Sequence, residues 1–192
     1  SVSGLTVTAG SRPLVSDLAC DLLPGETRCL AGESGSGKSI ASLAVVGLRP
    51  RPAGRLASGS VRLGGTELTA LPPSAMRAIR GQRIAMIFQE PMTCLSPLHT
   101  VGDQIGEALR IHTGADRKEA DARTEEALAR VGFPDPHRAL RTYPFELSGG
   151  LRQRAMIAMA LILKPAPLVA DEPTTALDVT TPAQILALLA RL

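Results

Sequence analysis

The stretch GESGSGKS, residues 32–39, decides the fold class of this 192-residue chain. It matches the spacing GxxxxGK[ST], in which glycines allow the backbone to curl until successive N–H groups point at phosphate oxygens. The apolar residues 27–31 before it predict a strand, and residues 38–47 predict a helix. Because the positive N-terminal end of that helix would face the same anion, the sequence predicts a loop that binds the phosphates of a nucleoside triphosphate.

Individual side chains of this loop have predictable roles. The ammonium group of Lys38 can reach the β- and γ-phosphates, and the hydroxyl of Ser39 can bind Mg²⁺. The residues expected to bind the nucleotide here are Gly32, Ser34, Gly35, Ser36, Gly37, Lys38, Ser39 and Ile40. The alternative is a chance glycine turn, which would produce this pattern in about one chain in a hundred of this length. By itself the loop does not identify which class of nucleotide-binding protein this chain is.

Two carboxylates follow a short apolar strand in LVADE, residues 168–172. Ligands of open α/β sheets bind at the carboxyl ends of the strands, which is where these two side chains would lie. Asp171 can hold the Mg²⁺ shell, and Glu172 can orient an attacking water or accept its proton. The alternative is an ordinary strand exit, and it becomes less favoured once the phosphate loop is considered together with it.

The pattern of the chain predicts an α/β core that carries a helical insertion. Residues 49–59 are rich in Pro, Gly and Arg and predict a loop, and from about 100 to 164 the pattern is helical with no clear strand. We expect strands at 2–7, 17–23, 27–31, 60–65, 83–88 and 168–170, and helices at 38–47, 74–80, 116–131, 149–163 and 181–192. The core would comprise residues 1–91 and 165–192, and the helical subdomain residues 92–164.

The bulk composition favours an ordinary globular domain over the other classes considered. Hydrophobic residues make up 44% and charged residues 20%, which is ordinary for a globular domain. The net charge of +3 comes without a dense Lys/Arg run or aromatics to stack on bases, so a solvated surface is favoured over a nucleic-acid interface. The three cysteines, Cys20, Cys29 and Cys94, form no CxxC pair and are interpreted as free thiols.

A membrane role would have to come through a partner. The longest apolar run, residues 155–163, is far too short to span a bilayer. No secretory signal opens the chain.

The motif LSGGLRQR, residues 147–154, resembles the signature motif of ABC ATPases. Small GTPases and nucleotide kinases, which share the phosphate loop, do not carry it. Ser148, Gly149 and Gly150 would offer a hydroxyl and bare N–H groups at a helix start, which makes a second anion site. A plain helix N-cap is the alternative, but it accounts for the Ser-Gly pair and not for the whole string.

Further elements of the ABC pattern follow in the family's order, so the resemblance covers essentially the whole chain. Gln89 resembles the Q-loop glutamine, which touches Mg²⁺ and water and faces the transmembrane partner. Asp178 resembles the D-loop aspartate. The resemblance implies nucleotide held between two domains arranged head to tail, with Lys38 of one facing Ser148 of the other.

Shorter stretches resemble the peptide/nickel importer branch of this family. They are FQEPM at 88–92, SPL at 96–98, VG at 101–102 and YPFE at 143–146. The resemblance implies an ATPase that uses ATP and Mg²⁺ and powers solute import from the cytoplasmic face of the inner membrane. The implied partners are permease subunits, a second identical or paralogous ATPase and, indirectly, a substrate-binding protein. The solute itself stays open.

Two positions depart from the family pattern within the motifs. The family usually has an aromatic near the end of its first strand to stack on adenine, whereas Ala9 and Gly10 occupy that region here. Arg12 could substitute by planar stacking, although a solvated arginine is favoured. Leu151 stands where this branch often has Met, which conserves apolar character.

The third departure concerns the switch-loop histidine, which in the family lies beyond the position of Leu192. His99, His112 and His137 all precede the signature motif and cannot fill that role. We therefore expect a C-terminally truncated P-loop NTPase domain with a RecA-like core and an antiparallel β part at its N-terminus. We expect it to bind nucleotide weakly and hydrolyse it poorly on its own.

Two other functions remain as alternatives. ABC ATPases of DNA repair insert long coiled coils or zinc modules between the Q-loop and the signature motif, and this chain has only a short helical stretch there. A nucleotide-binding module without turnover is the other possibility, against which the acidic Glu172 argues.

Overall fold

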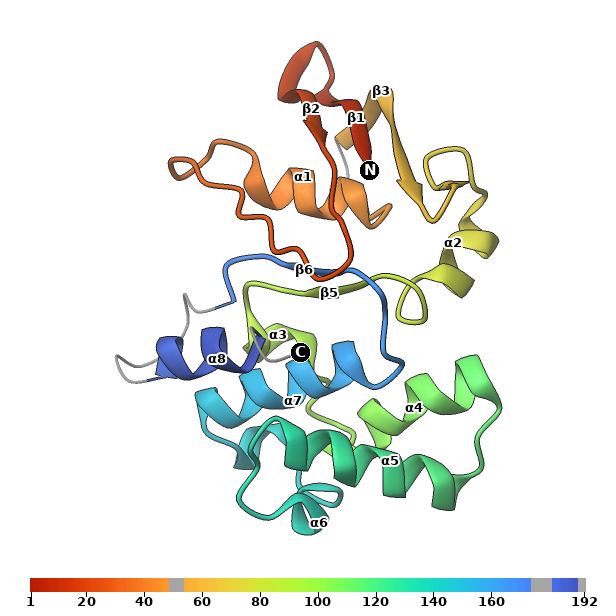
Figure 1. Ribbon diagram of the computed structural model, residues 1–192. Coiled ribbons are helices and arrows are strands. Elements are labelled where there is room, and N and C mark those ends of the chain that lie inside the picture. The colour runs from red at the N-terminus through yellow and green to blue at the C-terminus, as the bar shows by residue number, and fades with distance from the viewer. Residues whose placement is uncertain (49–53, 174–180, 190–192) are drawn as a thin grey trace. The chain divides into compact units, whose positions relative to one another are not determined.

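The structure of the chain is a computed structural model that describes residues 1–48, 54–173 and 181–189 (Figure 1). The chain divides into two compact units, Ser1–Arg80 and Gly81–Leu192. Each unit is built around its own strands and helices, and each is described by itself below.

The first unit is built on a four-stranded antiparallel sheet of order β2-β1-β3-β4. Its strands are β1 (Val2–Ala9), β2 (Arg12–Cys20), β3 (Gly54–Leu63) and β4 (Thr66–Glu67), and its helices are α1 (Lys38–Val45) and α2 (Pro73–Ile79). Helix α1 packs against β1 and β2. The buried apolar residues of this unit include Val2, Leu5, Val7, Ala41, Val46 and Val61. The antiparallel N-terminal part predicted from the sequence is confirmed.

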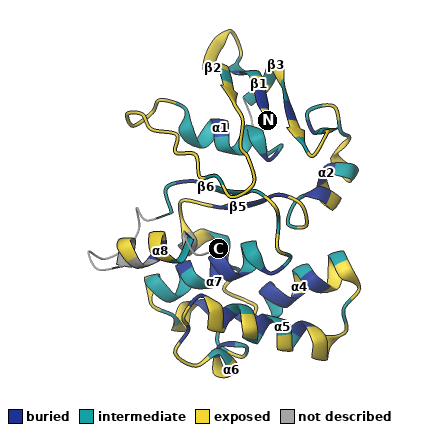
Figure 2. Cartoon of the chain, in the orientation of Figure 1, coloured by how far each residue is buried: buried dark blue, intermediate teal, exposed yellow. Residues whose placement is uncertain are grey.

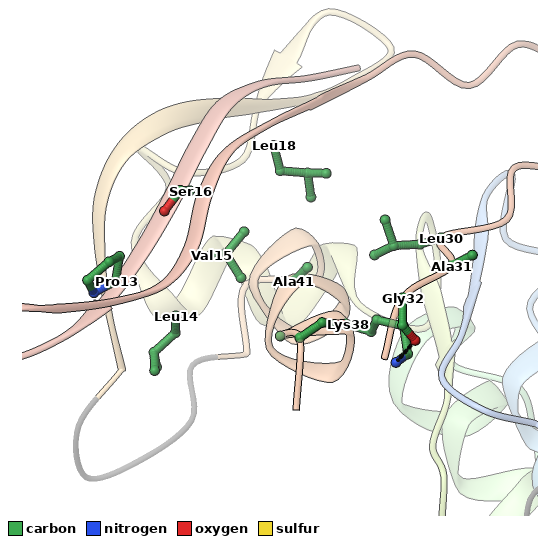
Figure 3. Close-up of a pocket in the computed structure, with 12 residues that line it drawn as sticks. Pro13, Leu14, Val15, Ser16, Leu18, Leu30, Ala31, Gly32, Lys38 and Ala41 are labelled. Atoms are coloured by element: carbon green, nitrogen blue, oxygen red, sulfur yellow. Dashed lines mark hydrogen bonds between the residues drawn. The ribbon is translucent and has the colours of Figure 1, made fainter. Parts of the chain in front are cut away.

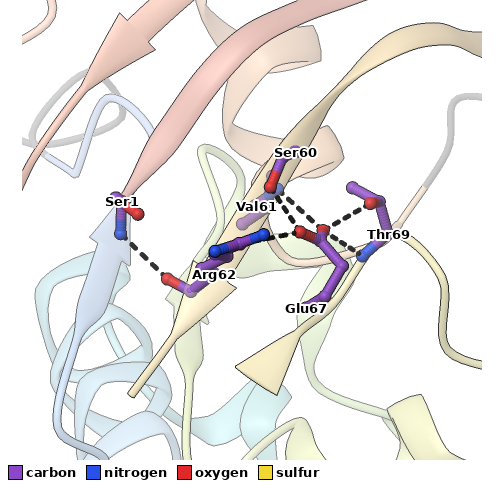
Figure 4. A network of polar contacts seen from close by, with 6 residues as sticks. All are labelled: Ser1, Ser60, Val61, Arg62, Glu67 and Thr69. Atoms are coloured by element: carbon purple, nitrogen blue, oxygen red, sulfur yellow. Dashed lines mark hydrogen bonds and ion pairs between the residues drawn. The ribbon is translucent and has the colours of Figure 1, made fainter. Parts of the chain in front are cut away.

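A carboxylate fixes the turn between β3 and β4. Glu67 accepts hydrogen bonds from the hydroxyls of Ser60 and Thr69 and from the backbone N–H groups of Val61 and Thr69 (Figure 4). Those hydrogen bonds, the hydroxyl of Ser60 first, hold the pKa of Glu67 at about 2, well below the usual value. The guanidinium of Arg62 adds an ion pair at 3.2 Å.

Three sequence predictions in this unit were wrong. The strand expected at 17–23 begins already at Arg12 and ends at Cys20. Residues 27–31 do not form a strand, because a strand needs a partner to complete its hydrogen-bond ladder and none pairs with them within the described part of the chain. Leu30 is accordingly 49% exposed. Strand β3 already begins at Gly54, inside the predicted loop 49–59, of which residues 49–53 lie outside the described residues. Its Gly59 is required by the sheet, because a Cβ there would lie 2.5 Å from the Cα of Leu5.

The second unit places helices around a pair of parallel strands. The strands are β5 (Ala85–Ile87) and β6 (Leu168–Ala170), paired from Ala85↔Leu168 to Ile87↔Ala170. The helices are α3 (Pro91–Cys94), α4 (Val101–Thr113), α5 (Arg117–Arg130), α6 (Pro136–Ala139), the 3₁₀ helix η1 (Pro144–Glu146), α7 (Gly149–Leu161) and α8 (Thr181–Leu189). The predicted helical region between 100 and 164 is confirmed.

Standard caps set the limits of the longer helices in this unit. The hydroxyl of Thr100 accepts from the N–H of Asp103 at the start of α4, and Gly114 ends α4 in the left-handed conformation. The carboxylate of Asp116 caps α5 in the same way as Thr100 caps α4. Figure 2 shows the buried positions on α4, α5 and α7, whose fully buried side chains include Ile105, Leu109, Leu128 and Ile157. Within the described residues, no helix combines the length and apolar composition needed to cross a bilayer.

Candidate functional site

The phosphate loop of the first unit is a tight turn that leads directly into helix α1. The ammonium group of Lys38 donates to the carbonyls of Gly32 and Glu33, both at 2.8 Å, so the side chain folds back across the loop. Gly37 has φ 93° and forms the N-cap of α1. A Cβ on Gly32 would lie 2.7 Å from the hydroxyl of Ser36, so a larger residue there would force the Ser36 side chain to move. The first turn of α1 carries no acidic residue, which leaves its positive end available to an anion.

Helix α1 is held at its other end by Arg80. The guanidinium donates to the carbonyl of Val46 at 2.9 Å and to that of Gly47 at 2.6 Å, just beyond the helix. A cation at a helix C-terminus is favourable because it meets the negative end of the helix dipole. Partial burial lowers the pKa of Arg80 from its usual value, with Arg77 contributing in the same direction. These contacts hold the C-terminal end of α1 in place.

A pocket of about 380 Å³ lies beside the phosphate loop (Figure 3). The loop forms one part of its lining, with Gly32, Ser36 and Lys38, and strand β2 forms another, from Pro13 to Leu18. The two parts touch closely, because a Cβ on Gly37 would lie 2.4 Å from the carbonyl oxygen of Leu14. The pocket therefore joins a polar, cationic end to an apolar wall.

The acidic residues of the second unit lie at the carboxyl ends of its two parallel strands. The N–H of Asp171 donates to the carbonyl of Ile87 at 2.9 Å, so the pairing of β5 with β6 continues one residue past β6. Asp171 is buried, with 7% of its surface exposed. The amide of Gln89 donates to the carboxylate of Glu172 at 2.8 Å. The structure thus brings together three residues predicted from the sequence at the edge where α/β sheets bind ligands.

Gln153 is a site residue that sequence reasoning missed. It lies on α7 with 1% of its surface exposed, and its amide donates to the carbonyl of Pro173 at 2.9 Å. Pro173 directly follows Glu172, whose φ of 44° is unusual for a residue other than glycine. The signal for this residue in the sequence was a glutamine within a helix of otherwise apolar inward-facing positions.

The signature residues lie at the start of α7. The hydroxyl of Ser148 accepts from the N–H of Leu151 at 3.3 Å and caps the helix. Ser148 and Gly149 are exposed, and a Cβ on Gly149 would meet nothing within 4 Å. Packing within the described residues therefore does not require glycine at position 149.

The predicted residues are shared between the two units. Lys38 and Ser39 belong to the first unit, and Gln89, the signature residues and the acidic pair belong to the second. Asp178 lies outside the described residues. Within the described residues, no group of three or more His, Cys, Asp or Glu side chains is arranged to hold a metal ion.

Comparison with known proteins places this arrangement in a family. A model of the ABC transporter family matches residues 15–175. The chain belongs to the ABC transporter family. Its fold is similar to that of a dimeric ATP-binding cassette solved in a post-hydrolysis state with ADP and Pi, with a TM-score of 0.84 and 29% identity. That likeness covers 98% of this chain and 80% of the solved one, so the ABC cassette fold predicted from the motifs is confirmed.

Relatives of this ABC protein are named for the transport of peptidoglycan or of dipeptides. It is 54% identical over 175 residues to the peptidoglycan transport ATP-binding protein YejF of Agrobacterium fabrum, which covers 91% of this chain and 32% of YejF. It is 48% identical over 183 residues to the dipeptide transport ATP-binding protein DppD of Bacillus subtilis, which covers 95% of this chain and 55% of DppD. The chain spans about half the length of such relatives or less.

Proposed function

We propose that this chain is the ATP-binding and ATP-hydrolysing part of a transporter that imports peptides. The observation that carries the proposal is the hydrogen bond between Gln89 and Glu172 at the carboxyl edge of a parallel strand pair, in a chain that also has a complete phosphate loop. The name of the dipeptide relative DppD supports the peptide class, and nickel remains the other solute of the predicted branch.

The phosphates would bind in the loop at residues 32–39. Backbone N–H groups and the N-terminus of α1 supply fixed positive dipoles, and Lys38 supplies a full charge. Lys38 would exchange its two carbonyl partners for phosphate oxygens, which is favourable because an ionised acceptor makes the stronger hydrogen bond.

Glu172 is the proposed general base or water-orienting group. Its carboxylate is half-buried and one of its oxygens already accepts from Gln89. Gln89 would hold the carboxylate in place and would itself lie near the attacking water. Catalysis of phosphoryl transfer depends mainly on such positioning and on neutralising charge, for which these residue types suffice.

Mg²⁺ would bind only together with the nucleotide. Mg²⁺ is usually bound through one or two carboxylates plus phosphate oxygens and water, and a cage made by the protein alone is unusual. Ser39, Asp171 and Gln89 offer a hydroxyl, a carboxylate and an amide oxygen, the donor types that Mg²⁺ takes. When bound, the ion would neutralise charge on the phosphates.

The proposed partners are a second ATPase domain and permease subunits, with the chain attached to the inner membrane at its cytoplasmic face. Ser148, Gly149 and Gly150 are exposed or half-buried at a helix start, so they are available to a nucleotide bound on another copy. The dimeric state of the similar cassette supports this arrangement. A substrate-binding protein would act on the permease and not on this chain.

Separate measurements of ATP binding and of ATP hydrolysis test this function. Lys38→Ala should abolish binding of ATP, measured by displacement of a fluorescent nucleotide, whereas Lys118→Ala on the exposed face of α5 should not change it. Glu172→Gln should keep ATP binding and lose Mg²⁺-dependent hydrolysis in the assembled transporter, whereas Glu107→Gln should keep both. Normal turnover by Glu172→Gln would refute the role of Glu172, and binding by Lys38→Ala would refute the phosphate site.

A further inference from the structure

The pocket beside the phosphate loop has an unusual wall for a nucleotide site. Beyond Lys38 and the loop, its lining is mainly aliphatic, with Leu14, Val15, Leu18 and Leu30 (Figure 3). Three of these residues are half-buried and Leu30 is 49% exposed, so none of the four is sealed in the core. A group attached to a triphosphate held by Lys38 would lie against this surface.

The distance between the wall and the loop is set by backbone contact. Strand β2 carries three of the four aliphatic residues, and the carbonyl oxygen of Leu14 approaches Gly37 so closely that a Cβ would lie 2.4 Å from it. Helix α1 also packs against β2. Because both the phosphate-binding and the aliphatic parts belong to the same unit, the pocket does not depend on where the second unit lies.

The wall has no means of stacking on a base. Residues 1–80 contain no Phe, Tyr or Trp, so this unit has no aromatic ring to offer. Stacking on an aromatic ring is a major source of affinity for a base, and aliphatic contact contributes less. Arg12, the residue considered as a substitute, is not among the residues that line the pocket.

The lining also has little means of reading the edge of a base. Adenine carries an amino donor where guanine carries a carbonyl acceptor, and distinguishing them requires a fixed donor or acceptor. Among the described residues of the lining there is no amide or carboxylate side chain, and Ser16 and Ser36 contribute hydroxyls. A hydroxyl can either donate or accept, so it serves both bases.

We propose that this pocket binds the base and ribose on the aliphatic surface of Leu14, Val15, Leu18 and Leu30, and that it accepts ATP and GTP nearly equally. The proposal rests on the proposed binding of triphosphate at Lys38. Affinity then comes mainly from the phosphates, and the base adds a small apolar contribution that does not depend on its edge.

Competition binding tests the proposal. Displacement of a fluorescent ADP analogue by ATP, GTP and tripolyphosphate, each with Mg²⁺, gives three dissociation constants. We expect the dissociation constants of ATP and GTP to agree within about threefold. Tripolyphosphate should bind roughly threefold to tenfold more weakly than either nucleotide. ATP binding more than about thirtyfold tighter than GTP would overturn the proposal, as would tripolyphosphate binding as tightly as ATP.

Two leucines of the same segment provide matched variants. Leu30→Ala should weaken the binding of ATP and of GTP by the same factor, about threefold, and leave the binding of tripolyphosphate unchanged. Leu23→Ala removes a leucine that is 67% exposed and does not line the pocket, so it should change none of the three constants. An unchanged ATP affinity in Leu30→Ala, or unequal losses for ATP and GTP, would contradict the aliphatic site.

A variant that is expected to bind nucleotide more tightly tests the proposal independently of variants that lose affinity. Leu18→Tyr introduces the missing ring and should tighten both ATP and GTP roughly fivefold or more, with no effect on tripolyphosphate. Lys38→Ala tests the proposed phosphate site separately from the base site, because it should weaken the binding of all three ligands. If Lys38→Ala leaves all three constants unchanged, the phosphate site itself is wrong and the base site is refuted with it.

Discussion

Gly102→Ala should destabilise the second unit because α4 passes very close to the backbone after α6. A Cβ at position 102 would lie 2.5 Å from the carbonyl oxygen of Leu140 and 2.8 Å from its Cα, about 1 Å short of ordinary contact. The backbone cannot move apart freely, because the N–H of Val101 donates to the carbonyl of Thr142 at 2.9 Å. Overpacking of this kind costs about 1–3 kcal/mol and loss of that hydrogen bond about 1 kcal/mol, against a helix-propensity gain of about 1 kcal/mol.

The net expectation is a loss of about 1–3 kcal/mol in the free energy of unfolding, measured by urea titration with far-UV circular dichroism. Gly106→Ala, one turn further along α4, is the matched control. Its Cβ would meet the hydroxyl oxygen of Thr124 at 3.4 Å and the Cβ of Ala120 at 3.5 Å, which is ordinary contact. It should be neutral or stabilising by up to about 1 kcal/mol, and equal stability of the two variants would refute the steric argument.

Three further substitutions test other parts of the structure. Thr124→Val should raise stability by roughly 1 kcal/mol in the same urea titration, because the Thr124 hydroxyl is buried and makes no hydrogen bond within the described residues. Glu67→Gln should lower stability at pH 7 and reduce its decline on acidification, measured by thermal unfolding from pH 7 to 2. The folded pKa of Glu67 is depressed to about 2, so its contribution is present above the unfolded value near 4.5 and is lost as the pH falls toward 2. Gln153→Leu should cost about 1–3 kcal/mol because it leaves the carbonyl of Pro173 without its amide donor; no loss on urea unfolding would show that this bond is unimportant.

Features fixed by local chemistry could be predicted from the sequence. The helix after the phosphate loop begins at Lys38 as predicted, and α5 begins directly after the cap at Asp116. Local chemistry could not show whether residues 27–31 form a strand, because a strand exists only if a partner pairs with it. Gly59 was interpreted as a loop residue, whereas its positive φ and its close approach to Leu5 place it inside β3.

The candidate site was predictable residue by residue but not as an arrangement. The resemblance to ABC ATPases pointed to Gln89 and the strand-end position pointed to Glu172, while the bond that joins them spans 83 positions and depends on how β5 and β6 pair. Gln153 was missed for a related reason. Its role comes from a hydrogen bond to a carbonyl 20 residues away, which the pattern of α7 does not show.

The backbone at Glu172 shows how tertiary contacts fix a functional side chain. A positive φ at a residue other than glycine costs on the order of 1 kcal/mol, so this conformation would not persist on local grounds. Hydrogen bonds on both sides of it offset that cost, one from Gln89 to the carboxylate and one from Gln153 to the following carbonyl, each contributing about 1 kcal/mol. Under the proposed function, the carboxylate is therefore oriented before the nucleotide binds, and a substrate would not have to supply the free energy needed to order it.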